Sequence, residues 1–216
     1  MKKFLGIILA VAMMMAMPAC VLADSADAAT EPAATSEPKS EGVMTYDEYV
    51  AADLDSQVVV ETYVQAKQSW WEDKATFYTQ DMDGAYFVYN MPCTQEEYDA
   101  LVPGTKIKVT GYKAEWSGEV EIIDATYEIE EGEYVAPATD VTELLGTDEL
   151  INYQNRFVSF KGMTVEAADD NGAAFLYNWD GSGTQGDDLY FNVSLNGTTY
   201  TFTVESYLCG SDTDVY

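Results

Sequence analysis

The sequence contains no histidine and few positive charges. Lys and Arg together number 10 against 38 Asp and Glu, so the formal net charge is −28 at pH 7. The absence of His excludes a zinc site of the usual ligand type and a His general base. No GxSxG or P-loop motif offers another catalytic centre, and no GxGxxG motif follows a predicted strand. We therefore expect a protein that is not an enzyme, with no catalytic residues, no metal site and no cofactor.

The excess of acid bears on the choice of partner. Affinity for nucleic acid comes largely from Lys and Arg that neutralise phosphates, and a polyanion repels another polyanion. Nucleic acid is therefore disfavoured as a partner, and so is adhesion to an anionic membrane surface. A simpler explanation of the charge is that it keeps an extracellular protein soluble.

Only one long hydrophobic run is present. Two lysines precede an apolar segment from Phe4 to Met17, which is shorter than the roughly 20 residues that a membrane-spanning helix needs. This build is typical of a secretory signal peptide, which we assign to residues 1–20. The alternative is ordinary cleavage after Ala23, which would release a soluble protein. Under both interpretations the mature chain lies outside the cytoplasm.

The signal peptide ends at a cysteine. Its last residues, Met17-Pro18-Ala19-Cys20, resemble the lipobox of bacterial lipoproteins. This resemblance implies that Cys20 carries a lipid that anchors the chain to the bacterial cell membrane. Of the 3 cysteines, Cys93 and Cys209 then remain. They could pair in an oxidising compartment, but two cysteines are not a disulfide framework, and their redox state stays open.

Residues 21–43 are small, acidic and rich in Ala, Ser and Pro, without apolar periodicity. Such a segment cannot bury enough apolar surface to offset its ordering entropy. We expect a disordered spacer between the anchor and the first domain.

Aromatic and β-branched residues dominate the chain after the spacer, which favours an all-β fold. The first domain is assigned to residues 44–136, and two capping boxes, at Thr45 and Thr94, predict short helices. The predicted strands are Gln57–Lys67, Ala75–Thr79, Ala85–Asn90, Lys106–Tyr112 and Glu119–Tyr127.

The order strand, strand, strand, helix, strand, strand is that of the OB-fold, a five-stranded Greek-key β-barrel. Residues 101–112 support it, because a hydrophobic helix end, a Gly turn and an alternating strand lead to Gly111, where the strand bends. A small β-sandwich is the alternative.

A weak internal repeat predicts a second OB-like domain over residues 141–216, with a hairpin that turns at Asn196-Gly197. This copy ends before its helix and its last two strands. We expect either a fragment of a longer reading frame or a half-barrel that a partner strand completes. Together, the signal, the spacer and the two OB-like units resemble OB-fold bacterial lipoproteins of uncharacterised function. The resemblance implies no particular activity.

Short loops rich in Asp, Asn and Gly, such as residues 81–84 and 169–172, could supply oxygen ligands to calcium. None has the EF-hand spacing, and β-turns require the same residues. We interpret these loops as turns.

Aromatic residues are the best candidates for a binding site. An OB-fold binds ligands on the face of strands two and three and on the loops between strands one and two and between strands four and five. Aromatic rings there can stack on sugars, bases and other flat ligands. The predicted ligand-binding residues are Trp70, Trp71, Trp116, Tyr78 and Tyr86. The alternative is that the tryptophans close the open end of the barrel as part of its core.

These observations predict a non-enzymatic cell-envelope lipoprotein whose OB-like domains bind a carbohydrate, a peptide or a protein. Contact with the membrane is expected only through the lipid anchor. Two alternatives remain open, namely a nucleic-acid-binding OB-fold protein and a purely structural or assembly protein of the bacterial surface.

Overall fold

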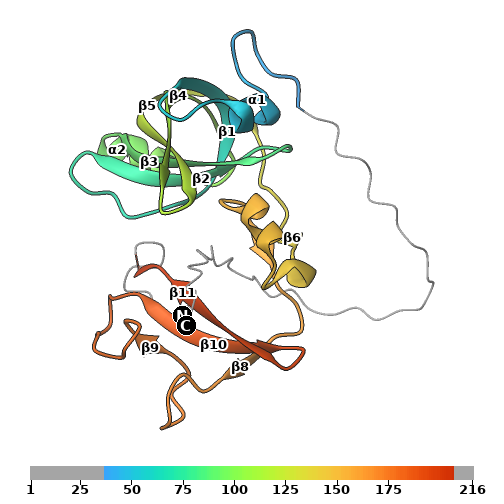
Figure 1. Cartoon of the computed structure of the whole chain (residues 1–216). Helices are drawn as coiled ribbons and strands as arrows, with labels where there is room; N and C mark the ends of the chain where they lie inside the picture. Colours follow the sequence, from blue (N-terminus) through green and yellow to red (C-terminus); the bar gives the residue numbers. More distant parts are fainter. Residues whose placement is uncertain (1–36, 207–216) are drawn as a thin grey trace, which may run out of the picture.

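The computed structural model describes residues 37–206, which form a closed β-barrel and a smaller second unit (Figure 1). The predicted signal peptide, the lipidation site Cys20, most of the spacer and Cys209 lie outside the described residues. Within the described range, no helix is long and apolar enough to cross a membrane.

The barrel follows the predicted order of elements. In chain order its helices and strands are α1 (Tyr46–Ala51), β1 (Gln57–Lys67), β2 (Lys74–Gln80), β3 (Ala85–Pro92), α2 (Gln95–Ala100), β4 (Thr105–Trp116) and β5 (Glu119–Glu133). The sheet closes in the order β1-β2-β3-β5-β4, with β3 and β5 parallel and the other neighbours antiparallel. A closed five-stranded barrel with a helix between its third and fourth strands fits the OB-fold. The predicted all-β, OB-like fold class is confirmed.

Both barrel helices begin at the predicted capping boxes. The Thr45 hydroxyl accepts a hydrogen bond from the Glu48 backbone N–H, and the Glu48 carboxylate accepts one from the Thr45 N–H (2.8 Å). Thr94 and Glu97 repeat this arrangement at α2 (2.7 Å for the carboxylate bond). These backbone bonds lower the pKa of both glutamates, because they stabilise the ionised carboxylate. Each box satisfies backbone donors that have no partner inside a short helix.

The barrel core explains why Gly111 stands where β4 bends. A Cβ on this residue would lie 2.6 Å from Ile122 Cγ2 and 2.8 Å from the Ile123 carbonyl oxygen, so no other residue fits without a shift. The register of β4 against β5 changes between Thr110 and Tyr112, which is the predicted bend. The core itself consists mainly of fully buried side chains, including Val58, Val60, Phe77, Tyr86, Val88, Met91, Leu101, Ile107, Val109 and Ile122.

Residues 37–44, which we call the N-terminal strap, pack against the barrel. The ammonium of Lys39 forms a buried ion pair with Asp81 (2.7 Å) and donates to the Glu61 carbonyl oxygen (3.1 Å). The Met44 N–H donates to the Val59 carbonyl (2.8 Å). From their composition, residues 37–43 were expected to belong to a disordered spacer. The strap is ordered because its one lysine finds buried acceptors, a partner that local composition does not reveal.

The second unit is a smaller, open arrangement of strands. Its elements are β6 (Thr139–Asp140), the 3-10 helices η1 (Thr142–Leu144) and η2 (Asp148–Tyr153), β7 (Val158–Ser159), β8 (Thr164–Glu166), β9 (Leu176–Tyr177), β10 (Leu189–Leu195) and β11 (Thr198–Val204). In the described part, β11, β10 and β8 form one sheet in that order, and β9 pairs with β10. The predicted hairpin is present, and Asn196 and Gly197 both have positive φ. That this unit is a second OB-like domain stays a prediction.

Candidate ligand-binding face

The outer face of β2 and β3 is the position where an OB barrel binds its ligands. Residues that pair across an antiparallel ladder point to the same side. Phe77 pairs with Val88 on the inner side of the barrel, whereas Tyr78 pairs with Phe87 on the outer side. The next outer pair is Gln80 and Ala85.

These four outer residues are buried, although they point away from the barrel core. Tyr78 is 4% exposed and Phe87 is 5% exposed, and their ring centroids lie 5.0 Å apart. Gln80 and Ala85 are also buried. We call these four residues the covered end of the face.

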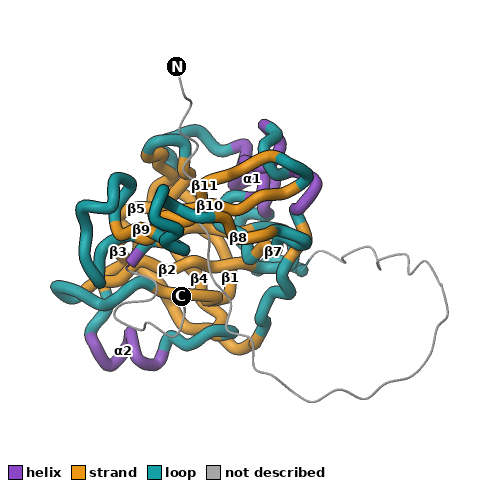
Figure 2. Tube along the Cα trace, turned by 90° about the horizontal axis from the view of Figure 1, so that it is seen from below, coloured by secondary structure: helices purple, strands orange, loops and turns teal. Residues whose placement is uncertain are grey.

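The second unit provides the cover. It lies below the barrel in Figure 1 and in front of β2 and β3 in Figure 2, which is viewed from below. Gln80 Oε1 accepts a hydrogen bond from the Phe157 backbone N–H (2.9 Å). Burial raises the pKa of the Tyr78 phenol, and the charge of Glu205, which follows β11, contributes to the shift. The second unit therefore occupies part of the surface that an OB-fold normally offers to a ligand.

Three further hydrogen bonds join the two units, and all come from residues 154–156. Gln154 Oε1 accepts from the Val120 N–H (2.8 Å), and Asn155 Nδ2 donates to the Val120 carbonyl (3.1 Å). Arg156 Nη2 donates to the carbonyl of Asp83 in the β2–β3 turn (2.8 Å).

Carboxylates gather where β5 meets the second unit. Desolvation, followed by the charges of Glu121 and Glu205, raises the pKa of Glu119 to about 7. Burial also raises the pKa of Glu121, and burial together with the nearby charge of Asp188 raises that of Glu205. Bringing the two units together thus places negative charges near one another in a partly dry environment.

The other end of the face is open to solvent. It consists of Trp71 in the loop before β2, Lys74 at the start of β2 and Tyr89 in β3, and we call these three residues the open end. Trp71 is 64% exposed and Tyr89 is 44% exposed. The Lys74 ammonium lies 5.3 Å from the centroid of the Trp71 ring. An exposed indole with a cation beside it can stack on a flat ligand.

The predicted site residues fall into three environments. Trp71 and Trp116 are exposed, the latter at 73% as the last residue of β4. Trp70 packs against the barrel core, and its indole N–H donates to the Cys93 carbonyl (2.9 Å). Tyr86 is fully buried in the core and donates to Asp81 (3.1 Å), while Tyr78 belongs to the covered end. The structure does not gather the five residues on one accessible surface, and their ligand-binding role stays a prediction.

Sequence reasoning did not select Lys74, Tyr89 or residues 154–157. Tyr89 follows from the pairing of β2 and β3, because it lies on the same side as Phe87, with which it stacks at 6.3 Å. Nothing in the sequence marks residues 154–157 as the contact with the barrel.

Most cations of the described part already have partners. Lys106 forms ion pairs with three glutamates, the closest being Glu61 at 3.2 Å. Lys113 donates to three carbonyl oxygens at the end of α1. Among the described residues, no group of His, Cys, Asp and Glu side chains is arranged to hold a metal ion.

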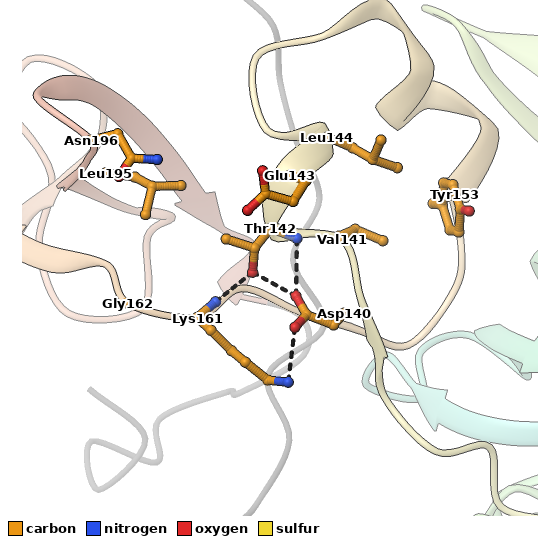
Figure 3. Close-up of a pocket in the computed structure, with 10 residues that line it drawn as sticks. All are labelled: Asp140, Val141, Thr142, Glu143, Leu144, Tyr153, Lys161, Gly162, Leu195 and Asn196. Atoms are coloured by element: carbon orange, nitrogen blue, oxygen red, sulfur yellow. Dashed lines mark hydrogen bonds and ion pairs between the residues drawn. The ribbon is translucent and has the colours of Figure 1, made fainter. Parts of the chain in front are cut away.

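A polar hollow in the second unit is a weaker candidate (Figure 3). The Asp140 carboxylate lies 2.8 Å from the Lys161 ammonium and accepts hydrogen bonds from Thr142. These bonds, led by that of Lys161, lower the Asp140 pKa to about 2. The polar side chains therefore satisfy one another and leave little for a ligand.

No protein-family model matches the sequence, and a search of curated proteins also gives no match. Among solved structures, the chain is similar to a murine DNA-binding protein bound to double-stranded DNA, with 10% identity and a TM-score of 0.35, over 67% of this chain and 72% of the other. It is also similar to the HINa domain of Ifi202 in complex with a 20-bp double-stranded DNA, with 12% identity and a TM-score of 0.35, over 68% of this chain and 77% of the other.

These structures contradict two expectations from the sequence. We expected a cell-envelope protein that binds a carbohydrate, a peptide or a protein, with nucleic acid disfavoured, but both neighbours are DNA complexes. Neither supports the lipoprotein, secreted or surface assignment. The net negative charge disfavours contacts with phosphates but does not affect stacking on bases. It therefore could not exclude nucleic acid as a partner. DNA binding remains a property of those two proteins, because a likeness this remote does not transfer it to this chain.

Proposed function

We propose that the barrel binds single-stranded nucleic acid, without catalysis, by stacking unpaired bases on its open end. The observation that carries the proposal is the exposed indole of Trp71 in the loop between β1 and β2. In OB-folds this loop is one of two that bind oligonucleotides. Stacking on aromatic side chains contributes roughly 1–3 kcal/mol per base and tolerates any sequence.

The net negative charge of the chain determines how the proposed binding should depend on salt. Stacking acts on the uncharged faces of the bases, and Lys74 beside Trp71 is one cation available to a phosphate. The remaining negative charge repels the strand, and added salt screens this repulsion. We therefore expect affinity that stays constant or rises with salt, whereas phosphate-driven binding weakens steeply.

The test is fluorescence anisotropy of labelled oligothymidylate, titrated with the full chain at low and high NaCl. A strand of the same length with abasic sites is the matched ligand control. We expect binding of the thymidylate strand alone. Trp71→Ala should weaken it by about ten-fold, the loss of one stacked base.

Trp179→Ala is the matched protein control, because this tryptophan of the second unit is as exposed as Trp71 and should leave binding unchanged. The proposal is wrong if neither DNA nor RNA single strands bind, if the abasic strand binds equally well, or if Trp71→Ala retains full affinity.

For location, we propose export and lipid attachment at Cys20, which rest on residues 1–20 of the sequence alone. The test is labelling of cells that express the full chain with a clickable fatty acid. Cys20→Ser should abolish the label, whereas Cys93→Ser should keep it. A wild-type chain without label would reject the anchor and favour cleavage after Ala23.

A further inference from the structure

We infer that the second unit is a removable cover on the ligand face of the barrel, and that repulsion among interface carboxylates opens it. A strand that extends from the open end along β2 and β3 would compete with this unit for Tyr78 and Phe87. The competition rests on the proposed function. The cover and its opening do not, because they can be measured without any ligand.

The covered end of the ligand face is buried. Tyr78 and Phe87 form an aromatic pair on the outer side of the barrel. From the barrel, Gln68 Nε2 donates to the Tyr78 phenol oxygen (3.2 Å). Removing the second unit would expose two large rings beside the already exposed Tyr89. The open and covered ends would then form one continuous aromatic surface, as a stacking platform for several bases requires.

The cover is attached to the barrel by few hydrogen bonds. In the described part no sheet runs from one unit into the other, and the hydrogen bonds between them come from the short segment 154–157. Gln65 fixes the end of the barrel, because its side chain bonds the Tyr134 carbonyl (3.1 Å) and the Ala136 N–H (2.8 Å). A hinge directly after Ala136 would let the second unit move while the barrel stays intact.

The interface between the two units carries several carboxylates. The groups that face Glu119 are Glu121 on its own strand, Glu205 after β11, with Asp188 near it, and the phenol of Tyr78 on β2. The charged groups that shift the Glu119 pKa in the described part are both carboxylates, Glu121 and Glu205. Ionisation of any of these carboxyl groups therefore destabilises the covered state.

The direction of the pH effect follows from the raised pKa of Glu119. The covered state binds this proton more tightly than an opened state, in which the carboxyl returns toward its ordinary value of 4.5. The stabilisation is fully present below about pH 4.5 and is lost as the pH rises through about 7. The cover should therefore open more readily above neutral pH.

Amide hydrogen exchange tests the cover on the full chain without nucleic acid. The Val120 and Phe157 N–H groups donate to side chains across the interface, so their protection factors report opening. We expect these factors to fall by about ten-fold or more between pH 6 and 8, since one pKa unit is a factor of ten. Val60 and Val109 are paired within the barrel. The protection factors of their amides should not fall together with those of Val120 and Phe157.

Two variants sharpen the test. Glu119→Gln removes the titrating charge and should keep the Val120 and Phe157 amides protected at pH 8. Glu143→Gln, an exposed glutamate of η1, is the matched control and should retain the wild-type pH response. Protection that does not depend on pH, or that depends on it equally in Glu119→Gln, would overturn the inference.

Gln154→Ala connects the cover to binding, because it removes the acceptor of the Val120 N–H. We expect lower Val120 protection and several-fold tighter binding of oligothymidylate. Lost protection with unchanged affinity would overturn the competition. If no strand binds but protection still follows the Glu119 charge, the cover stands and the proposed function fails.

Discussion

The barrel and the second unit use the same residue types and reach different degrees of closure. Each barrel strand has a bonded neighbour on both sides, and the longest, β5, spans Glu119–Glu133. In the described part of the second unit, β8 and β11 end the main sheet, and the main core cluster consists of Val141, Leu145, Leu150, Val193 and Phe202. Closure removes unpaired edges and surrounds the core. The second unit, without closure, gains burial by resting on the barrel.

The largest expected difference lies in the two cores. Phe77 and Phe202 are both fully buried, one in each unit. Phe77→Ala should lower the free energy of unfolding of the barrel by about 3–5 kcal/mol through the cavity that it leaves. Phe202→Ala should disrupt the second unit and leave the barrel transition in place. Urea unfolding followed by hydrogen exchange distinguishes the units, and an equal loss of barrel stability in both variants would show that they unfold together.

The ion pairs give the next contrast. Lys39 and Asp81 are buried, so Lys39→Ala leaves an unpaired buried carboxylate and should cost about 3 kcal/mol. Lys161 and Asp140 in the second unit are exposed, and Lys161→Ala should cost less than about 1 kcal/mol. Urea midpoints of the two variants measure the difference. Equal midpoints would mean that the strap does not contribute to the stability of the barrel.

The interface between the units predicts a pH dependence of stability. The raised pKa of Glu119 means that the free energy of unfolding should decrease as the pH rises from about 5 to about 8. Glu119→Gln should flatten this part of the profile by about 1–2 kcal/mol, which corresponds to roughly one pKa unit of linkage. Thermal unfolding at a series of pH values provides the measurement. An unchanged slope in the variant would assign the dependence to other carboxylates.

Helix capping should give the smallest contrast. Thr94 caps α2 with its hydroxyl, whereas Thr147, at the start of η2, makes no side-chain cap bond. Thr94→Ala should lower the free energy of unfolding by about 1 kcal/mol, and Thr147→Ala by only a few tenths. Chemical denaturation of both variants provides the test, and a larger effect at Thr147 would refute the difference.

Much of the barrel could be predicted from the sequence because its signals are local. The capping boxes at Thr45 and Thr94, the turn at Asp81–Gly84 and the bend at Gly111 each depend on neighbouring residues. The β10–β11 hairpin follows from Asn196 in the same way. Strand ends differ by a few residues, because the ladder extends strands beyond the run of apolar residues.

The side of the barrel to which each aromatic residue points was harder to predict than the turns and caps, because it depends on strand register. Tyr78 and Tyr86 are eight residues apart, which places them on the same side in a simple alternation. The turn between β2 and β3 pairs Tyr86 with Thr79, so the two tyrosines point to opposite sides of the barrel. The cover over Tyr78 depends on residues 154–157, a contact between distant segments that no local pattern signals.

The N-terminal strap has a mechanical consequence. A pull on the chain from its N-terminal side first loads Glu37, which is bonded to Tyr63 of β1 and Lys106 of β4. It then loads Lys39, whose ion pair with Asp81 leads to the β2–β3 turn. Arg156 of the second unit holds the same turn through the Asp83 carbonyl. The strap and the second unit thus share one anchoring point on the barrel, the β2–β3 turn.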